Sequence, residues 1–394
     1  MTWRAVDSRG VVVDAASMIR LGPAVVACAA SLMLALLAGG AVQAQPVAEA
    51  APELTPAADP SPRPTLPSPA QAIGNAAQAH ADGESSTVPA ARSPWIDLAP
   101  TRLVDRIWQQ PRRDNRLAAG LTLGGIYAGF TTWTYFAWYR KHKPLSQFRW
   151  GGDGLFDDRS YAGGADKLGH MWATMSLGRA GTELLNQWGG YNRLTANIVS
   201  TALAETLFFL IEVKDGFYYE MSVGDLIGNT AGAALGFAFS QWPRLDEMFD
   251  FRVEYWPSTQ YRRQFKNGNV NIAEDYSGET YLAAFHLGAV HALRDHKYGL
   301  WSRFVDVTVG FGTRGYKPTN PGIEYPREQH LSFGLSLNAQ GLFDWLLDGR
   351  KSQAARTTRA ITHGVFEVFN VPFTAVPVIK NIHTATGPVK MGGA

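Results

Sequence analysis

The stretch that decides the fold reads SVGDLIGNTAGAALG and covers residues 222–236. Its glycines recur every four residues, at positions 224, 228, 232 and 236. This spacing places all four on one helix face and lets a neighbouring backbone approach closely. Since a glycine inside a helix costs about 1 kcal/mol relative to alanine, four in register indicate a packing purpose. We predict a helix that begins after Ser222 as its N-cap and ends near Gln241.

Three apolar segments before this stretch also predict helices, over 117–139, 166–187 and 194–213. The first carries no formal charge, and at about 1.5 Å per residue it reaches about 35 Å, enough to cross a bilayer core. Basic residues flank it on both sides, and tryptophan and tyrosine gather at its second end, which is typical of a membrane interface. A buried helix of a soluble domain is the alternative, because glycine and threonine dilute the run.

The C-terminal third alternates with a period of two residues, which predicts half-buried strands over 303–311 and 330–338. The segments 251–256 and 280–291 predict two more. We therefore predict an α+β fold, in which a membrane-associated helical core with Gly-rich helix packing precedes a strand-rich antiparallel C-terminal part. The sheet is expected to have an apolar face that meets lipid.

Histidines are scattered through this C-terminal part without the spacing of a zinc signature. We interpret them as dispersed polar side chains, at His286, His291, His296 and His330.

The N-terminus predicts export and four regions along the chain. Residues 1–45 have the order of a signal peptide, with an apolar run followed by Ala-Val-Gln-Ala before the expected cleavage site. An uncleaved anchor helix is the alternative, and Cys28 lies inside the apolar run rather than at its end, which disfavours lipid attachment. Residues 46–94 contain ten prolines and no aromatic residue, so we predict a disordered Pro/Ala-rich linker. A helical core over 95–245 and a strand-rich region over 246–394 follow.

Composition excludes several classes of protein. Lys+Arg 36 against Asp+Glu 34 gives a net charge of +2, without the clustered positive charge of a nucleic-acid-binding surface. Charged residues make up 18%, below the roughly 25% of globular proteins, and 12 Trp with 40 Gly accompany them, which favours a membrane-associated protein. A single Cys excludes a disulfide framework and a cysteine-based zinc site. No GxSxG elbow, P-loop or HExxH helix is present.

Polar residues inside the predicted helices form the candidate site. Carboxylates in apolar helices are costly to bury unless they are paired, hydrogen-bonded or bound to a metal. If the helices pack together, six residues can converge: Asp166, His170, Glu212, Asp215, Asp225 and Asn229. Three interpretations stay open: a structural network neutralised by Lys167 and Lys214, an acid–base pair, and a site for a hard divalent cation. The identity of any metal is undetermined, and we expect no organic cofactor.

These residues carry a resemblance to known families. The strings Asp166-Lys-Leu-Gly-His170, Glu212-Val-Lys-Asp215-Gly-Phe and 222–232 resemble the YfiM-type family of bacterial envelope proteins of unknown function. They are more distantly similar to VanZ-like membrane proteins, which share the order D-K-x-x-H, then E, then D-x-x-x-N-x-x-G. The resemblance covers about residues 160–240. The arginine that VanZ-like proteins have between the glutamate and the aspartate is absent, since residues 216–221 read GFYYEM.

The resemblance implies an exported cell-envelope protein with no established reaction. We expect a structural or interaction role at a periplasm-facing membrane, inner or outer, with membrane lipid or envelope components as partners. No nucleic-acid partner is expected, and protein partners are undetermined. One alternative is a membrane enzyme that acts on a lipid or a lipid-linked cell-wall precursor, with His170 or Glu212 as acid–base. The other is a divalent-cation-binding module.

Overall fold

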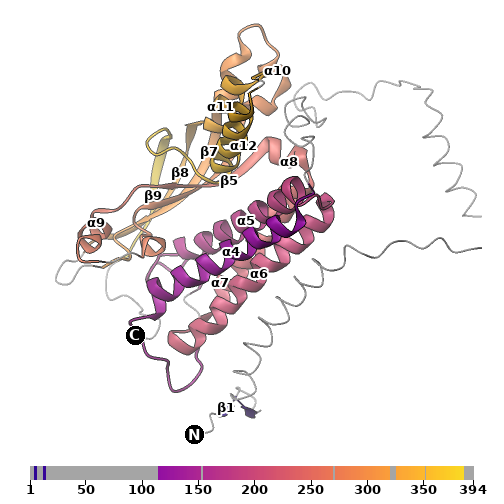
Figure 1. Cartoon of the computed structure of the whole chain (residues 1–394). Helices are drawn as coiled ribbons and strands as arrows, with labels where there is room; N and C mark the ends of the chain where they lie inside the picture. Colours follow the sequence, from indigo (N-terminus) through magenta and orange to yellow (C-terminus); the bar gives the residue numbers. More distant parts are fainter. Residues whose placement is uncertain are drawn as a thin grey trace, which may run out of the picture. The chain divides into compact units, whose positions relative to one another are not determined.

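A computed structural model of the chain describes residues 4–6, 12–14, 114–151, 154–268, 271–319, 325–350 and 352–385 (Figure 1). The chain divides into two compact units, Met1–Ala38 together with Pro94–Ala394, and Gly39–Ser93. All elements below belong to the first unit. The linker predicted over 46–94 and most of the predicted signal peptide lie outside the described residues. Within 1–45, β1 (Arg4–Val6) pairs antiparallel with β2 (Val12–Asp14).

The four predicted helices are present. Their bounds are α4 (Arg116–Thr134), α5 (Ala165–Glu183), α6 (Arg193–Tyr218) and α7 (Val223–Gln241), and α4 and α5 continue as π-helical turns over Tyr135–Tyr139 and Leu184–Trp188. The Ser222 hydroxyl accepts a hydrogen bond from the backbone N–H of Asp225, so Ser222 is the N-cap of α7, as predicted. Two short strands, β3 (Trp150–Gly151) and β4 (Met221–Ser222), form a parallel pair; β3 precedes α5 along the chain, and β4 directly precedes α7.

The glycine face of α7 packs against the backbone of α5. A Cβ atom at Gly228 would lie 2.6 Å from the carbonyl oxygen of Lys167, and one at Gly232 would lie 2.2 Å from that of Met171. One turn further on, a Cβ at Gly236 would lie 3.0 Å from the carbonyl oxygen of Met175. Glycines four residues apart on α7 therefore pack on backbone positions that are also four residues apart on α5. This confirms the predicted Gly-rich helix packing.

A five-stranded antiparallel sheet follows the helices. Its order along the sheet is β5 (Phe249–Tyr255), β6 (Glu279–His286), β7 (Val305–Arg314), β8 (Arg327–Leu337) and β9 (Val376–Ala385). Four of these strands match the predicted ones, although β6 ends at His286, where a 3-10 turn (Leu287–Ala289) begins. β9 was not predicted, nor were the helices α8 (Pro243–Met248), α9 (Thr259–Phe265), α10 (His291–Arg294), α11 (Ala339–Leu347) and α12 (Gln353–Val368). Two further 3-10 segments cover Ile272–Glu274 and Gly299–Phe304.

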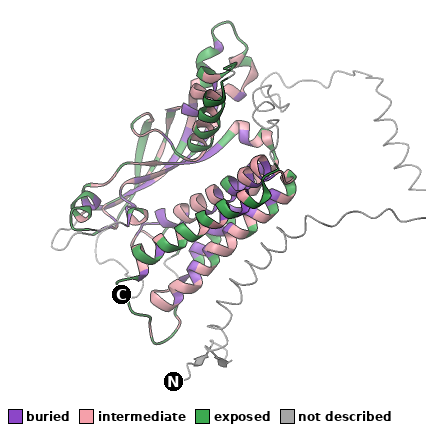
Figure 2. Cartoon of the chain, in the orientation of Figure 1, coloured by how far each residue is buried: buried purple, intermediate pink, exposed green. Residues whose placement is uncertain are grey.

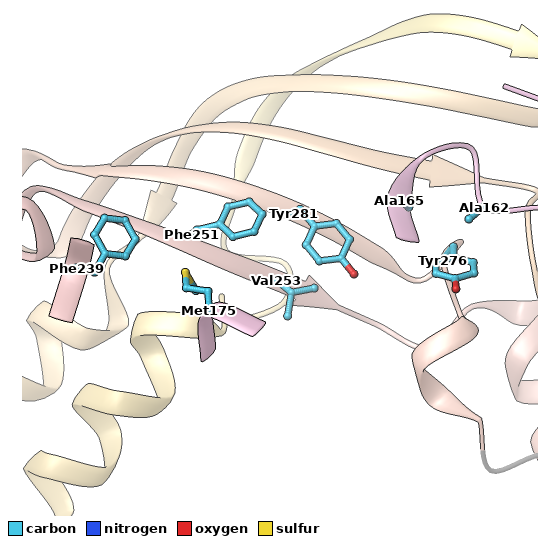
Figure 3. Packing of buried hydrophobic residues seen from close by; sticks show 8 residues of the cluster. All are labelled: Ala162, Ala165, Met175, Phe239, Phe251, Val253, Tyr276 and Tyr281. Carbon is cyan, nitrogen blue, oxygen red and sulfur yellow. The ribbon is translucent and has the colours of Figure 1, made fainter. Parts of the chain in front are cut away.

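One apolar cluster joins the helices to the first strands of the sheet (Figure 3). Met175 of α5 and Phe239 of α7 pack in it with Phe251 and Val253 of β5 and with Tyr281 of β6. Burial of one apolar side chain of this size stabilises the folded state by roughly 1.5–3 kcal/mol. The cluster therefore fixes α5 and α7 against the β5–β6 edge.

Farther along the sheet, in β7 and β8, the polar side chains are the buried ones and the apolar side chains are exposed. In β7 the polar side chains of Asp306 and Thr308 are buried, whereas Val309 is exposed. In β8, Leu331, Phe333 and Leu335 alternate with less exposed polar residues, and Phe333 is 60% exposed. The alternation of the sequence is confirmed, but in this half of the sheet the apolar face is the exposed one.

The segment expected to cross a membrane is corrected by the structure. Among the described residues α6, with mean hydropathy 1.6, is the helix long and apolar enough to do so, and α4 is not. Glycine and threonine lower the hydropathy of α4, and its α-helical part ends at Thr134. Core helices of soluble proteins also reach this length and hydropathy, so α6 alone does not establish a membrane span.

Candidate functional site

The polar residues predicted to converge come from one end of the helical bundle. Asp166 and His170 lie on the first turns of α5, Asp225 and Asn229 on the first turns of α7, and Glu212 on the last turns of α6. Because α5 and α7 pack in register along the glycine face, their N-terminal turns lie side by side. Asp166 and His170 are four residues apart, as are Asp225 and Asn229, so the two side chains of each pair lie on the same face of their helix.

Three of these side chains form a triad of metal-ligating type. One ligand atom from each of His170, Glu212 and Asp225 lies within 4.8 Å of the other two. The Nδ1 atom of His170 is 3.5 Å from Oε1 of Glu212, and its Nε2 atom is 3.9 Å from Oδ1 of Asp225. A divalent ion bound by nitrogen and oxygen ligands at about 2.0–2.2 Å needs ligand atoms about 3–4 Å apart. The ligand atoms of the triad, within 4.8 Å of one another, lie somewhat farther apart than that upper limit.

Neighbouring side chains hold the triad in place. Oδ1 of Asn229 lies 3.0 Å from Nδ1 of His170 and also accepts a hydrogen bond from the Thr174 hydroxyl. An Nδ1–H group that donates to Asn229 leaves Nε2 as the free lone pair, on the side of Asp225. The ammonium group of Lys167 lies 2.8 Å from Oδ1 of Asp225 and 2.7 Å from Oδ2 of Asp166. Asp166 is therefore an anchor for Lys167 rather than a member of the triad.

Three buried carboxylates face two basic side chains in this cluster. Asp166, Glu212 and Asp225 are all buried, and Glu212 is 1% exposed. Lys167 compensates one negative charge, and His170 compensates a second only when it is protonated. No side chain donates a hydrogen bond to either carboxylate oxygen of Glu212 among the described residues, and the backbone N–H of Ser222 lies beside it. A buried carboxylate in this state has to take up a proton or a cation.

Asp215, the sixth predicted residue, faces another neighbour. Its Oδ1 atom accepts a hydrogen bond of 2.6 Å from the hydroxyl of Tyr139, at the end of the π-helical turn that follows α4. Lys214 lies over the ring of the same tyrosine, with its Nζ atom 3.6 Å from the centroid. The contacts of Asp215 therefore join α6 to α4, and Asp215 does not belong to the triad.

A second buried polar cluster, which the sequence analysis missed, lies on the sheet. The guanidinium of Arg252 contacts both Asp250 and Asp306, with 2.7 Å from Nη1 to Oδ2 of Asp306. His286 contacts the same two carboxylates at 3.1 and 2.7 Å, and Asn338 donates to Asp306 at 2.9 Å. The interpretation of His286 as a dispersed polar side chain is wrong. Asp250 and Arg252, two residues apart in a strand, were the signal that could have indicated a buried polar face.

Charges in this second cluster balance, which favours a structural role. Burial alone raises the pKa of Asp250, but Arg252 and His286 hold it well below its ordinary value. Burial alone lowers the pKa of His286, but Asp306 and Asp250 raise it to about 9. Two carboxylates therefore face two cations. The cluster around the triad differs because it has three carboxylates for two basic side chains.

Comparison with known protein families gives a match for the segment that contains the triad. Residues 152–241 match the family model of DUF2279, described as a predicted periplasmic lipoprotein. The matched segment spans α5, α6 and α7 and so contains all six predicted site residues. No match was found among curated proteins or among solved structures. The match supports an exported envelope protein of unknown function, while the resemblance to YfiM-type and VanZ-like proteins stays a prediction.

Proposed function

We propose that the helical part of this exported envelope protein binds a divalent transition-metal ion through His170, Glu212 and Asp225. The observation that carries the proposal is the buried Glu212 carboxylate, which accepts no side-chain hydrogen bond among the described residues and whose Oε1 atom lies 3.5 Å from Nδ1 of His170. A metal ion would neutralise it and would join α5, α6 and α7, each of which supplies one ligand. This function is compatible with the structural role at the membrane that the sequence predicts.

The donor set favours some metals over others. One imidazole nitrogen and two carboxylates suit zinc, manganese or ferrous iron, whereas calcium and magnesium prefer sites made of oxygen alone. Asn229 and Lys167 would act as outer-sphere residues, since Asn229 orients the imidazole and Lys167 orients Asp225. We therefore expect zinc or manganese to bind more tightly than calcium.

The test compares two buried glutamates. Purified full-length protein and its Glu212→Gln and Glu279→Gln variants are stripped with a chelator, titrated with ZnCl2 or MnCl2, and assayed for bound metal and thermal unfolding. Glu279 of β6 is the matched control, because it is buried, burial raises its pKa to about 8, and its partner is Tyr281 rather than a triad residue. Wild type and Glu279→Gln should bind about one ion per chain with a higher Tm. Glu212→Gln should lose at least about 10-fold in affinity.

Two results would overturn the proposal: a wild-type protein whose Tm and metal content do not respond to either ion, or a Glu212→Gln variant that binds as tightly as the control. In the first case the structural network is the remaining interpretation of the cluster. A Glu212 carboxyl that carries a proton would then be neutral and would need no cation.

A membrane enzyme that acts on a lipid or a lipid-linked cell-wall precursor is the second candidate. What favours it is the access to His170, whose side chain is 20% exposed although the Glu212 side chain beside it is buried. An imidazole that reaches the surface can exchange protons with a substrate. The test is a mass-spectrometric lipid profile of a deletion strain that carries either the wild-type protein or Asp225→Asn at matched abundance. A changed lipid species supports the enzyme, and an identical profile contradicts it.

A further inference from the structure

Large apolar side chains point outward from three of the four long helices. Figure 2 shows exposed residues along α4, and exposed apolar residues also occur on α6 and α7. Leu121 of α4 is 67% exposed, Ile198 of α6 is 52% exposed and Ile227 of α7 is 50% exposed. The same three helices also expose Leu117, Ile126, Leu194, Phe209 and Val223. We call these outward-pointing residues the outer apolar surface.

Helix α5 has no comparable surface. It packs against α6, α7 and the sheet, and among its residues only Ala180 is exposed. α4 covers the other end of α5 and part of α6 through a cluster that contains Ala119, Leu123, Leu185 and Ala196. The helical part therefore has its most polar groups inside and apolar side chains outside, which is the reverse of a helical domain in water.

Charged groups avoid the outer apolar surface. The segment 117–139 contains none, and Asp225 on α7 is buried. Glu205 lies at the middle of α6, but its Oε1 atom accepts a hydrogen bond of 2.8 Å from the Thr230 hydroxyl and its Oε2 atom is buried. Glu205 is thus directed to α7 rather than outward. Basic residues lie at the helix ends, at Arg116, Arg140, Lys141, Lys143, Arg193 and Arg244.

Length and burial both fit a bilayer, and α6 also has the hydropathy of a membrane span, which α4 and α7 do not reach among the described residues. α7 has 19 residues, which at about 1.5 Å per residue gives about 29 Å, close to the thickness of a bilayer core. The most apolar part of α6 is only 33% buried within the protein, whereas a core helix of a soluble protein is mostly buried. The apolar side chains of α6 therefore need a cover that the described residues do not supply.

We propose that the outer apolar surface of α4, α6 and α7 contacts the acyl chains of a phospholipid bilayer, so that the helical part is embedded in the membrane. The basic residues at both helix ends would then lie at the level of anionic headgroups. Three helices exposing apolar side chains favour lipid over a second copy of the chain, because a dimer contact covers one side of a bundle. The triad lies near one membrane face, since Asp225 is the third residue of α7. This proposal does not depend on metal binding.

Spin labels on single cysteines test the surface. Labels are placed at Leu121→Cys, Ile198→Cys and Ile227→Cys, each in a Cys28→Ser background of the full chain. Tyr298→Cys is the matched control, because Tyr298 is also exposed, at 70%, but lies outside the helical part. The proteins are reconstituted into phosphatidylethanolamine–phosphatidylglycerol vesicles, and collision rates with oxygen and with a water-soluble nickel chelate are measured. Circular dichroism establishes that each labelled protein is folded.

For acyl-chain contact we expect a several-fold higher oxygen-to-nickel collision ratio at the three helix positions than at Tyr298→Cys. Equal ratios at all four positions would show that the helices are in water and would overturn the proposal. Labels that are shielded from both reagents and broadened by spin–spin coupling would instead show that a second copy of the chain covers the surface, which also overturns it.

Discussion

The ammonium nitrogen of Lys167 lies 2.8 Å from Oδ1 of Asp225, which joins the first turn of α5 to the first turn of α7. Both side chains are buried. The absence of a side chain at Gly224 leaves room for Lys167, because a Cβ atom there would lie 2.6 Å from Cε of the lysine. Close helix packing and charge pairing therefore depend on the same few residues. A buried cation in this position also determines how many negative charges remain for a metal.

Lys167→Met should destabilise the protein by about 3–5 kcal/mol, because it leaves Asp166 and Asp225 buried without their cation. The measurement is urea unfolding followed by circular dichroism. Lys317→Met is the control, since the Lys317 side chain is 38% exposed and 3.5 Å from Glu274, and such a surface pair contributes at most about 1 kcal/mol. Equal losses in the two variants would contradict the assigned role of Lys167.

Gly232→Ala should destabilise the helical part by about 3 kcal/mol, because the new methyl group would lie 2.2 Å from the carbonyl oxygen of Met171, a backbone atom that cannot yield alone. Gly129→Ala in α4 is the matched control, since nothing lies within 4 Å of its Cβ position. That change should stabilise the protein by roughly 0.5–1 kcal/mol through helix propensity. Thermal unfolding of both variants measures the difference, and a neutral Gly232→Ala would show that α5 and α7 are less close than described.

Asp215→Asn and Asp225→Asn should have different effects on metal binding. Asp215 is held by Tyr139 outside the triad, so its variant should bind zinc or manganese with wild-type affinity. Asp225 belongs to the triad, so its variant should lose at least about 10-fold in affinity. Isothermal titration of chelator-treated proteins gives both constants. Loss of binding in both variants would place Asp215 among the ligands and contradict the geometry.

His286→Gln should lower stability at pH 6 more than at pH 10. Asp306 and Asp250 raise the pKa of His286 to about 9, above its ordinary value of 6.5, although burial opposes this. The stabilisation by the charged imidazole is therefore fully present below about pH 6.5 and is lost as the pH rises through about 9, with an upper limit of about 3 kcal/mol. Urea unfolding at the two pH values measures the change. A stability difference between wild type and variant that does not depend on pH would show that His286 is neutral throughout.

The sequence by itself determined the four long helices α4 to α7 and most of the strands, because their signals are local. The four-residue glycine repeat required a close helix neighbour, and alternation in β7 and β8 required strands, whatever lay beside them. The sequence also placed Asp166, His170, Asp225 and Asn229 on shared helix faces. β9 and α12 were not predicted from the sequence.

Only the tertiary structure decided which polar residues meet and which faces are covered. Glu212 and Asp215 are three residues apart, yet one lies beside His170 of α5 and the other beside Tyr139, at the end of the π-helical turn that follows α4. Likewise, no local pattern shows that Asp306 is buried while Phe333 is exposed. Periodicity divides a strand or helix into two faces, but the neighbouring elements determine which face they bury.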